Sequence, residues 1–302
     1  MAVLVVGNCT YDRSFELDRF PQPGETLLAH RSCADIGGKG ANQAAAAACA
    51  GVPVAFCSVV GLDPEGAEFE RHLSTAGVDL RFLLRRDGPT DTSIIYLVPG
   101  GENAIVSSHA LTASLAASDV MPSLATLGPH DILLLQGNLH RETTGFCLRE
   151  GHRQGARVIL NPAPIHYDYD DLWSFVSIAI LNEVEAVTLG HCADPIESAG
   201  TILSKGVDVV ITTMGAAGAL LIHRSEQLRI PAPPVDVVDT TGAGDVFCGV
   251  FVAGLARRLK PDLAARWAVA AASLSVTRRG TQRAFPTHEE LASLLSRARL
   301  PD

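Results

Sequence analysis

Near its carboxyl-terminal third the chain has the stretch Val237-Val238-Asp239-Thr240-Thr241-Gly242-Ala243-Gly244-Asp245-Val246-Phe247-Cys248-Gly249. The two β-branched valines predict the end of a strand, and Val246–Leu259, after a turn of small residues, predicts a helix. Gly242 and Gly244 have no Cβ atom, so a bulky anion can approach the backbone N–H groups beside them. The unpaired N–H groups of a helix start, at the positive end of its dipole, suit a phosphoryl group.

Asp245 is unexpected at such a position, because a carboxylate repels an anion bound beside it. A carboxylate is useful there if it takes a proton from the nucleophile that attacks the phosphoryl group. The alternative is an ordinary helix start with Asp as a capping residue.

Composition narrows the class of protein. The chain has 302 residues, 47% of them hydrophobic, which is enough for a large core in one domain with an appendage or in two domains. Its net charge of −9 without a basic run argues against nucleic-acid binding. No apolar run reaches the roughly 18 residues of a membrane span, and the N-terminus lacks the charged region of a signal peptide. Seven cysteines without a C-x-x-C pair fit a reducing compartment, so we expect a soluble cytoplasmic protein.

Short apolar runs alternate with helical segments along most of the chain. The predicted strands are Ala2–Val6, Val54–Val60, Ile132–Gln136, Arg157–Asn161, Ser177–Leu181, Val207–Thr212 and Ala219–His223. The predicted helices are Ala41–Ala50, Pro64–Ala76, Arg141–Gln154, Ala264–Val276 and Thr287–Ala298. This alternation is typical of an α/β fold with a doubly wound, mostly parallel sheet flanked by helices.

Half-polar segments predict a second, smaller sheet, which we call the lid. Its predicted strands are Ser14–Phe20, Glu25–Arg31, Leu80–Arg85 and Ser93–Pro99, and Asn103–Ser107 is expected to return to the main sheet. The lid would then be built from about residues 12–33 and 79–100, inserted in a single domain of residues 1–302. Asp12 precedes these strands at the carboxyl end of another strand, where open α/β sheets bind ligands.

A second signature stands near the N-terminus, Gly37-Gly38-Lys39-Gly40-Ala41-Asn42-Gln43-Ala44. It is not a Walker loop, because Gly40 rather than Ser or Thr follows Lys39. With the stretch at 237–249 it resembles the ribokinase family of sugar kinases, the phosphofructokinase B type, in one order over nearly the whole chain. The resemblance implies an ATP-dependent, Mg²⁺-requiring carbohydrate kinase with a ribokinase-like fold and a small β-sheet lid.

The resemblance also implies roles for individual residues at the phosphoryl-transfer end. Asp245 would be the catalytic base, and Gly242, Ala243 and Gly244 would donate N–H groups to the γ-phosphate. Asn182 and Glu185 would help to hold the nucleotide phosphates and Mg²⁺, Glu185 through water. Thr213, Gly215 and Gly218 would form a nucleotide loop. By themselves, Asn182 with Glu185 equally fits a helix cap, and residues 213–218 equally fit a plain glycine turn.

On the sugar side the resemblance implies contacts from Asp12, Gly38, Lys39, Gly40 and Asn42. Asp12 as a solvated acid at a strand end and Lys39 as a surface lysine are the plain alternatives. A monovalent-cation site, for an ion such as K⁺, would use Asp239 and the backbone carbonyls of Thr241, Ser275, Arg278 and Gly280. Ribokinases often have serine where this chain has Ala284, so one oxygen ligand is missing or replaced by water.

Three sugar-side positions depart from ribokinase itself. Thr10 stands where asparagine is usual, Asn138 where ribokinase has glutamate, and Ser107–Thr112 replaces the usual H-A-G-A-N run. A buried hydrogen-bond mismatch costs about 1–3 kcal/mol, so ribose is expected to be a poor substrate. Arg13, His109 and His140 suggest a more oxidised or anionic sugar as a variant of this hypothesis.

The leading hypothesis is therefore a kinase for a small pentose or ketose-type sugar, acting as a homodimer through paired lids, with sugar and ATP as its ligands and neither nucleic acid nor membrane as a partner. Within the family, the alternative is a nucleoside or sugar-phosphate kinase. From another class, the alternative is a non-catalytic sugar-binding regulator, which would not need the base. The absence of G-x-x-x-x-G-K-[ST] and G-x-G-x-x-G disfavours P-loop and hydride-transfer enzymes.

Overall fold

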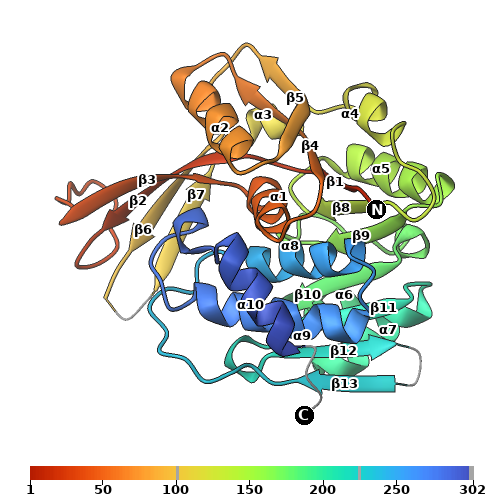
Figure 1. Ribbon diagram of the computed structural model, residues 1–302. Helices are drawn as coiled ribbons and strands as arrows, with labels where there is room; N and C mark the ends of the chain where they lie inside the picture. The colour runs from red at the N-terminus through yellow and green to blue at the C-terminus, as the bar shows by residue number, and fades with distance from the viewer. Residues whose placement is uncertain (100–101, 224–225, 299–302) are drawn as a thin grey trace.

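The computed structural model describes residues 1–99, 102–223 and 226–298, which fold into a large and a small sheet with helices (Figure 1). The large sheet consists of β1 Val3–Val6, β4 Val54–Gly61, β5 Asp79–Arg86, β8 Ile132–Gln136, β9 Arg157–Asn161, β10 Ile178–Asn182, β11 Val209–Thr213, β12 Ala219–His223 and β13 Glu226–Ile230. The small sheet consists of β2 Thr10–Glu16, β3 Arg31–Gly37, β6 Thr92–Leu97 and β7 Asn103–Ser107.

The large sheet has the order β13-β12-β11-β10-β9-β8-β1-β4-β5. Neighbours from β5 to β11 pair in parallel, and β12 and β13 complete one edge in antiparallel pairing. Strands such as Val3–Val6 and Ile132–Gln136 are buried along their whole length, as expected where helices cover both faces. The predicted doubly wound, mostly parallel α/β fold is confirmed.

Helices form one apolar layer on each face of this sheet, because alternate strand residues point to opposite sides. One layer contains α1 Lys39–Cys49, α2 Pro64–Thr75, α8 Ala243–Ala256, α9 Pro261–Ser275 and α10 His288–Ala298. The other contains α3 Ala110–Ala113, α4 Ala117–Leu124, α5 Arg141–Arg153, α6 Glu183–Gly190 and α7 Pro195–Ser204. Three single turns of 3₁₀ helix, η1 Trp173–Phe175, η2 Gly215–Ala217 and η3 Gln282–Ala284, lie in the connections.

The close packing of α1 against α8 matters most for the site. A Cβ atom at Gly249 would lie 2.6 Å from both the Cβ of Ala46 and the carbonyl oxygen of Gln43. Glycine at 249 and alanine at 46 therefore let the two helix backbones come close together. The first turns of α1 and α8 meet as a result.

The small sheet differs from the predicted lid in its strands. Segment 17–30, which contains Pro21, Pro23 and Gly24, forms the connection between β2 and β3 rather than a tight turn within a hairpin. Because β2 begins at Thr10, Asp12 lies inside a strand of the small sheet and not at the carboxyl end of a strand of the large sheet. Asn103–Ser107 pairs with β6 and does not return to the main sheet, so that prediction was wrong.

Two further strand predictions were wrong. Leu80–Arg85 belongs to β5, which pairs in parallel with β4 at the edge of the large sheet, so the second part of the small sheet comes from residues 92–107. Val237 and Val238 end no strand. They lie in an irregular connection after β13 and are 59% and 51% exposed. Pro231, Pro233 and Pro234 have no backbone N–H to donate to a neighbouring strand. The segment that contains them therefore does not continue as a strand, although β-branched residues follow.

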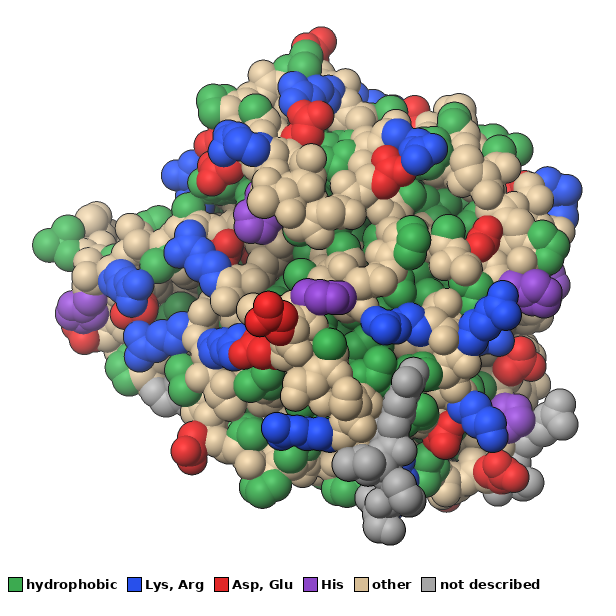
Figure 2. All heavy atoms as spheres, viewed as in Figure 1, with side chains coloured by type: hydrophobic (Ala, Val, Ile, Leu, Met, Phe, Trp, Pro, Cys, Tyr) green, Lys and Arg blue, Asp and Glu red, His purple; other side chains and the backbone are tan. Residues whose placement is uncertain are grey.

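The surface carries mixed charges. On the face shown in Figure 2, Lys and Arg side chains are interspersed with Asp and Glu, without the broad basic field that nucleic-acid recognition uses. Within the described ranges no helix is both long and apolar enough to span a membrane.

Candidate active site

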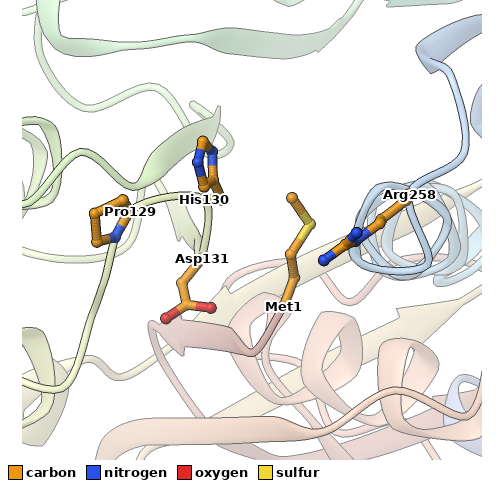
Figure 3. A pocket seen from close by; sticks show the side chains of 5 residues that line it. All are labelled: Met1, Pro129, His130, Asp131 and Arg258. Carbon is orange, nitrogen blue, oxygen red and sulfur yellow. The ribbon is translucent and has the colours of Figure 1, made fainter.

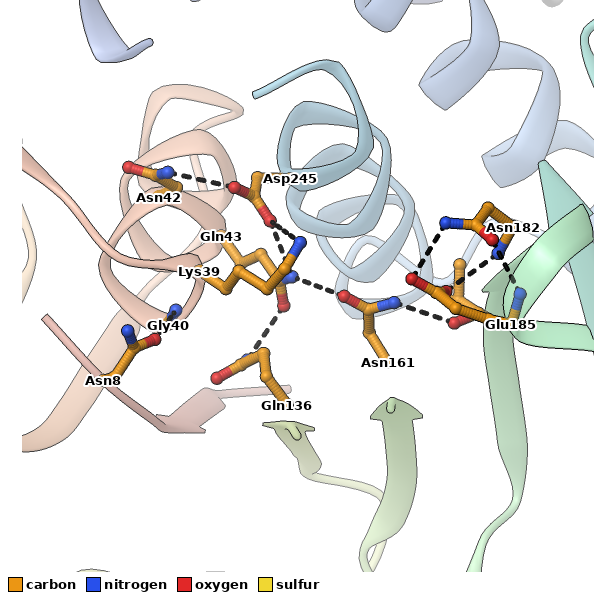
Figure 4. Close-up of polar contacts among 11 residues, drawn as sticks. Asn8, Lys39, Gly40, Asn42, Gln43, Gln136, Asn161, Asn182, Glu185 and Asp245 are labelled. Atoms are coloured by element: carbon orange, nitrogen blue, oxygen red, sulfur yellow. Dashed lines mark hydrogen bonds and ion pairs between the residues drawn. The ribbon is translucent and has the colours of Figure 1, made fainter. Parts of the chain in front are cut away.

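Asp245 lies in the first turn of α8; the residue is 5% exposed, and its carboxylate faces α1 (Figure 4). Asn42 donates from Nδ2 to its Oδ2 at 2.9 Å, and Gln43 donates from Nε2 to its Oδ1 at 3.0 Å. The Nζ of Lys39 is 3.8 Å from Oδ1. Asp245, together with Glu185, raises the pKa of Lys39, so this ammonium keeps its charge beside the carboxylate.

The turn before Asp245 opens the helix toward a pocket. Gly242 is the N-cap of α8 with φ of 77°, a left-handed conformation that favours glycine, and a Cβ there would lie 3.0 Å from Thr281. Ala243 is the first helical residue, three positions earlier than predicted. The pocket has a volume of about 440 Å³ and is lined by Lys39, Asn182, Glu183, Val184, Thr213, Gly215, Thr240, Gly242, Gly244 and Asp245. The structure thus brings most of the predicted phosphoryl-transfer residues together.

Asn182 and Glu185 form a capping box at the start of α6. Glu185 N donates to Asn182 Oδ1 at 2.8 Å, while Asn182 donates from N and Nδ2 to the two carboxylate oxygens of Glu185, each at 2.9 Å. The helix-cap interpretation of this motif therefore describes its geometry. Each Glu185 oxygen accepts one bond from Asn182 and has acceptor capacity left for water.

Only part of the predicted nucleotide loop, residues 213–218, lies at the pocket. Thr213 ends β11, and Gly215, with φ of 53°, begins η2; both line the pocket. Gly218 instead packs against β13, where a Cβ would lie 2.0 Å from the carbonyl oxygen of Ile230. Glycine at 218 is thus required by the close approach of two backbones.

Asp12 lies in the middle of β2, opposite Asp35 of β3 and beside Ser93 of β6. Thr10 donates from Oγ1 to Asp12 Oδ1 at 2.7 Å. Burial raises the pKa of Asp12 to about 6. Hydrogen bonds from Thr10 and Ser93 oppose this rise, whereas the negative charges of Asp35 and Asp245 add to it. A Cβ at Gly37 would lie 1.9 Å from Asp12 Oδ2, so glycine leaves room for this carboxylate.

The start of α1 packs against the connection between β1 and β2. Gly38 has φ of 92°, and a Cβ there would lie 2.7 Å from the Cα of Cys9. Gly40 donates from N to Asn8 Oδ1 at 3.2 Å. Asn138 follows β8 at the same edge of the large sheet, and its buried Oδ1 has no hydrogen-bond partner within the described residues.

The residues predicted for a monovalent cation lie on two adjacent segments. Asp239 accepts from Thr241 N and Gly280 N, both at 2.9 Å. Burial raises the pKa of Asp239, but these backbone bonds outweigh it and the pKa is lowered. Arg278 N donates to the carbonyl of Ser275, the end of α9, at 3.1 Å. Ala284, where a serine ligand was expected, is buried.

Sequence reasoning missed the side-chain amides around Asp245. Gln43 forms hydrogen bonds with both Gln136 and Asn161, and Gln282 donates from Nε2 to Asn42 Oδ1 at 2.9 Å. A signal was present, because Gln136 and Asn161 are polar residues that end otherwise apolar strands. Parallel strands place such residues at one edge of the sheet.

A separate cavity of about 490 Å³ is lined by Met1, Pro129, His130, Asp131 and Arg258 (Figure 3). It contains none of the predicted site residues. Both carboxylate oxygens of Asp131 already accept backbone bonds, from Ala2 and Gly128. Most of the residues predicted for phosphoryl transfer line the other pocket.

Comparison with known proteins agrees with this geometry. The family model of the pfkB family of carbohydrate kinases matches residues 2–288. A ribokinase of Haemophilus influenzae is 32% identical over 97% of this chain and 98% of its own, and a deoxyribokinase of Salmonella typhi is 30% identical over 98% and 99%. The structure of Arabidopsis thaliana ribokinase with ribose and ATP superposes with a TM-score of 0.88 at 27% identity, covering 97% and 98% of the two chains. The chain therefore belongs to the pfkB family and is a carbohydrate kinase, a phosphotransferase with an alcohol group as acceptor.

Proposed function

We propose that this kinase transfers the γ-phosphate of ATP to a hydroxyl of a small neutral sugar of the pentose or ketose type. The observation that carries the proposal is the carboxylate of Asp245 in the first turn of α8, where the N-terminus of the helix opens to the 440 Å³ pocket. A helix start attracts a phosphoryl group, and a carboxylate beside it is explained if it accepts the hydroxyl proton. ATP and ribose are bound together by the Arabidopsis relative.

In this proposal each part of the site has one task. Asp245 accepts the proton of the attacking hydroxyl, and the backbone N–H groups of Gly242 and Gly244 stabilise charge on the moving phosphoryl group. The N–H of Ala243 already donates to the carbonyl of Thr240 at 3.2 Å. Lys39, held 3.8 Å from Asp245, adds positive charge between acceptor and phosphate. Asp12, Thr10, Gly38, Gly40, Asn42 and Asn138 orient the sugar, and Asn182, Thr213 and Gly215, which line the pocket, hold the nucleotide.

The residues present fit two cations. Mg²⁺ prefers oxygen ligands and keeps several waters, which suits Glu185 because its oxygens retain acceptor capacity beside Asn182, a residue that lines the pocket. Bound there, Mg²⁺ would neutralise phosphate charge. Asp239 accepts hydrogen bonds from Thr241 N and Gly280 N and so connects their two segments. K⁺ would be held by Asp239 and by the carbonyls of Thr241, Ser275, Arg278 and Gly280.

A sugar phosphate is a less suitable acceptor than a neutral sugar. Arg13 is paired with Glu65, Arg85 with Glu70 and Arg86 with Asp119, so these three arginines are already neutralised by carboxylates. The buried face beside Asp12 carries a second carboxylate, Asp35. These acidic groups repel a phosphorylated sugar, whereas they accept hydrogen bonds from hydroxyl groups.

The test is an ADP-release assay with Mg-ATP and a panel of pentoses, hexoses, ketoses, nucleosides and sugar phosphates. We expect turnover with one or a few neutral sugars. A preference for a nucleoside or a sugar phosphate would support the alternative acceptors, and ADP release with none of them would contradict the proposal.

Sugar identity should depend on Thr10 and Asn138. Wild type is expected to phosphorylate ribose slowly or with a high KM, because the amide of Asn138 presents a donor as well as an acceptor, whereas a glutamate presents acceptors alone. The double change Thr10→Asn with Asn138→Glu should raise kcat/KM for ribose relative to the preferred sugar about tenfold. Efficient turnover of ribose by wild type, at hundreds per second with a submillimolar KM, would contradict this expectation.

We also propose a homodimer through the small sheets. Ile105 and Val106 on the edge strand β7 are 54% and 67% exposed, and Leu28 in the connection between β2 and β3 is 90% exposed. Phe15, Phe20, Ile94 and Tyr96 are half-buried, whereas Leu17 is already buried within the chain. Such an edge favours pairing with a second copy. Sedimentation at micromolar concentration should give a dimer, and Val106→Lys should shift it toward a monomer; a monomeric wild type would contradict the proposal.

A further inference from the structure

Behind Asp245 lies a chain of buried side-chain amides that comes from three different elements (Figure 4). Gln136, at the end of β8, donates from Nε2 to Gln43 Oε1 at 2.8 Å. Gln43, in α1, donates from Nε2 to Asn161 Oδ1 and to Asp245 Oδ1, both at 3.0 Å. Asn161, at the end of β9, donates from Nδ2 to the carbonyl oxygen of Ile180 at 2.9 Å. Gln43 and Gln136 are fully buried, and Asn161 is 7% exposed.

The bonds that run from Ile180 through Asn161 and Gln43 to Asp245 have their directions fixed from both ends, whereas Oε1 of Gln136 has no hydrogen-bond partner among the described residues. A backbone carbonyl only accepts, so Asn161 must turn its NH₂ group toward Ile180 and its oxygen toward Gln43. Gln43 must then present its NH₂ group to Asn161 and, with its second hydrogen, to Asp245. An ionised carboxylate also only accepts, so the requirement of Asp245 agrees with that of Ile180.

Close packing keeps Gln43 and Gln136 in place. Gly249 lets α1 approach α8, which brings Gln43 to Asp245. At Gly7 a Cβ would lie 2.0 Å from Gln136 Oε1, so the glycine provides space for that amide. Rotation of Gln43 would place its oxygen against two acceptors, and buried mismatches of this kind are costly.

We infer that Gln43 is a positioning residue for the base Asp245, with its own orientation fixed by Asn161. Gln43 holds Oδ1 of Asp245 while Asn42 holds Oδ2, so the carboxylate cannot rotate away from the pocket. Because both neighbours are donors, neither can take the proton that Asp245 receives. The proton stays on the side of the carboxyl group that faces the acceptor. This inference rests on the proposed function of Asp245.

The test is Gln43→Met, which keeps the length of the side chain and removes both donors. We expect kcat to fall about 10- to 100-fold, with KM for sugar and for ATP within threefold of wild type, because the base is misplaced while the binding groups remain. Gln136→Met is the matched control, since it removes an equally buried amide but leaves both N–H donors of Gln43; its kcat should stay within threefold. Thermal unfolding of all variants reports the general loss of stability.

A fall in kcat of less than fivefold for Gln43→Met, equal falls in both variants, or a fall explained by a rise in KM would overturn the inference. If Gln43→Met does not fold, Gln43→Asn decides by the same thresholds, because it keeps the amide but withdraws it by one methylene. ADP release by the wild-type enzyme distinguishes a failure of this inference from a failure of the proposed function. If wild type releases no ADP with any acceptor, the proposed function fails and the inference with it; if wild type is active, only the inference is at stake.

Discussion

Asp245→Asn is expected to lower kcat by about 100- to 10,000-fold, the usual contribution of a positioned base. The substitution keeps the shape of the side chain but removes the carboxylate that accepts the hydroxyl proton. ATP should still bind, because the pocket and the helix start are retained. The structure also predicts that Asp245→Asn lowers the free energy of unfolding. Both oxygens of Asp245 accept from N–H donors, so the new amide group must face either Asn42 or Gln43 donor to donor, at about 1–3 kcal/mol.

The measurement combines steady-state ADP release with calorimetric titration of ATP and thermal unfolding. Asp236→Asn is a suitable control, because it makes the same chemical change at an exposed carboxylate nine residues earlier. Its kcat and stability should match wild type. Turnover of Asp245→Asn within about threefold of wild type would remove Asp245 from the mechanism.

Asp12→Asn is expected to raise KM for the sugar about 10- to 100-fold and to stabilise the protein at pH 8. A hydrogen bond to a charged group contributes about 1.5–3 kcal/mol, and the amide loses this contribution to the sugar hydroxyls. The pKa of Asp12 is raised from 3.8 to about 6, so the folded protein binds this proton more tightly than the unfolded chain. Ionised Asp12 therefore costs about 2–3 kcal/mol of stability above pH 6, a cost that disappears as pH falls from 6 toward 4.

Two pH series test this prediction. In wild type, KM for the sugar should rise as pH falls below 6, because the carboxylate becomes protonated. The free energy of unfolding of Asp12→Asn should exceed that of wild type at pH 8, and the two should converge near pH 4. Asp18→Asn, at a carboxylate that is 85% exposed, controls for a general change in net charge. An unchanged KM in Asp12→Asn would place Asp12 outside the sugar pocket.

Local chemistry made several features predictable from the sequence. The apolar runs that became β1, β8, β9 and β10 had to be buried on both faces, which specifies a parallel sheet between two helix layers. Glycines at 242 and 244 beside Asp245 marked a helix start, which the structure places at a pocket. The alanine-rich segment after Gly40 marked a helix that packs closely. These signals work because each depends on neighbours within a few residues.

Sheet membership was decided only by tertiary structure. β5 has the same half-polar character as the strands of the small sheet, yet it pairs with β4. Val237 and Val238 have the preferred residue type for a strand, but they follow three prolines in an irregular connection, and Val238 N donates to the carbonyl of Val276 after α9 instead of to a strand. A strand requires a neighbour that supplies its hydrogen bonds, and a single sequence does not name that neighbour.

The sequence by itself determined the fold class, the helix start with its carboxylate, and the glycine-rich turn near the N-terminus, because these follow from local backbone chemistry. Tertiary structure alone decided how Asp245 is held. Gln43 is 202 positions away from Asp245 and Asn161 is 118 away from Gln43, yet all three share hydrogen bonds. Buried amides must satisfy every donor and acceptor, and which groups meet is known only once α1, α8 and the strand ends are packed together.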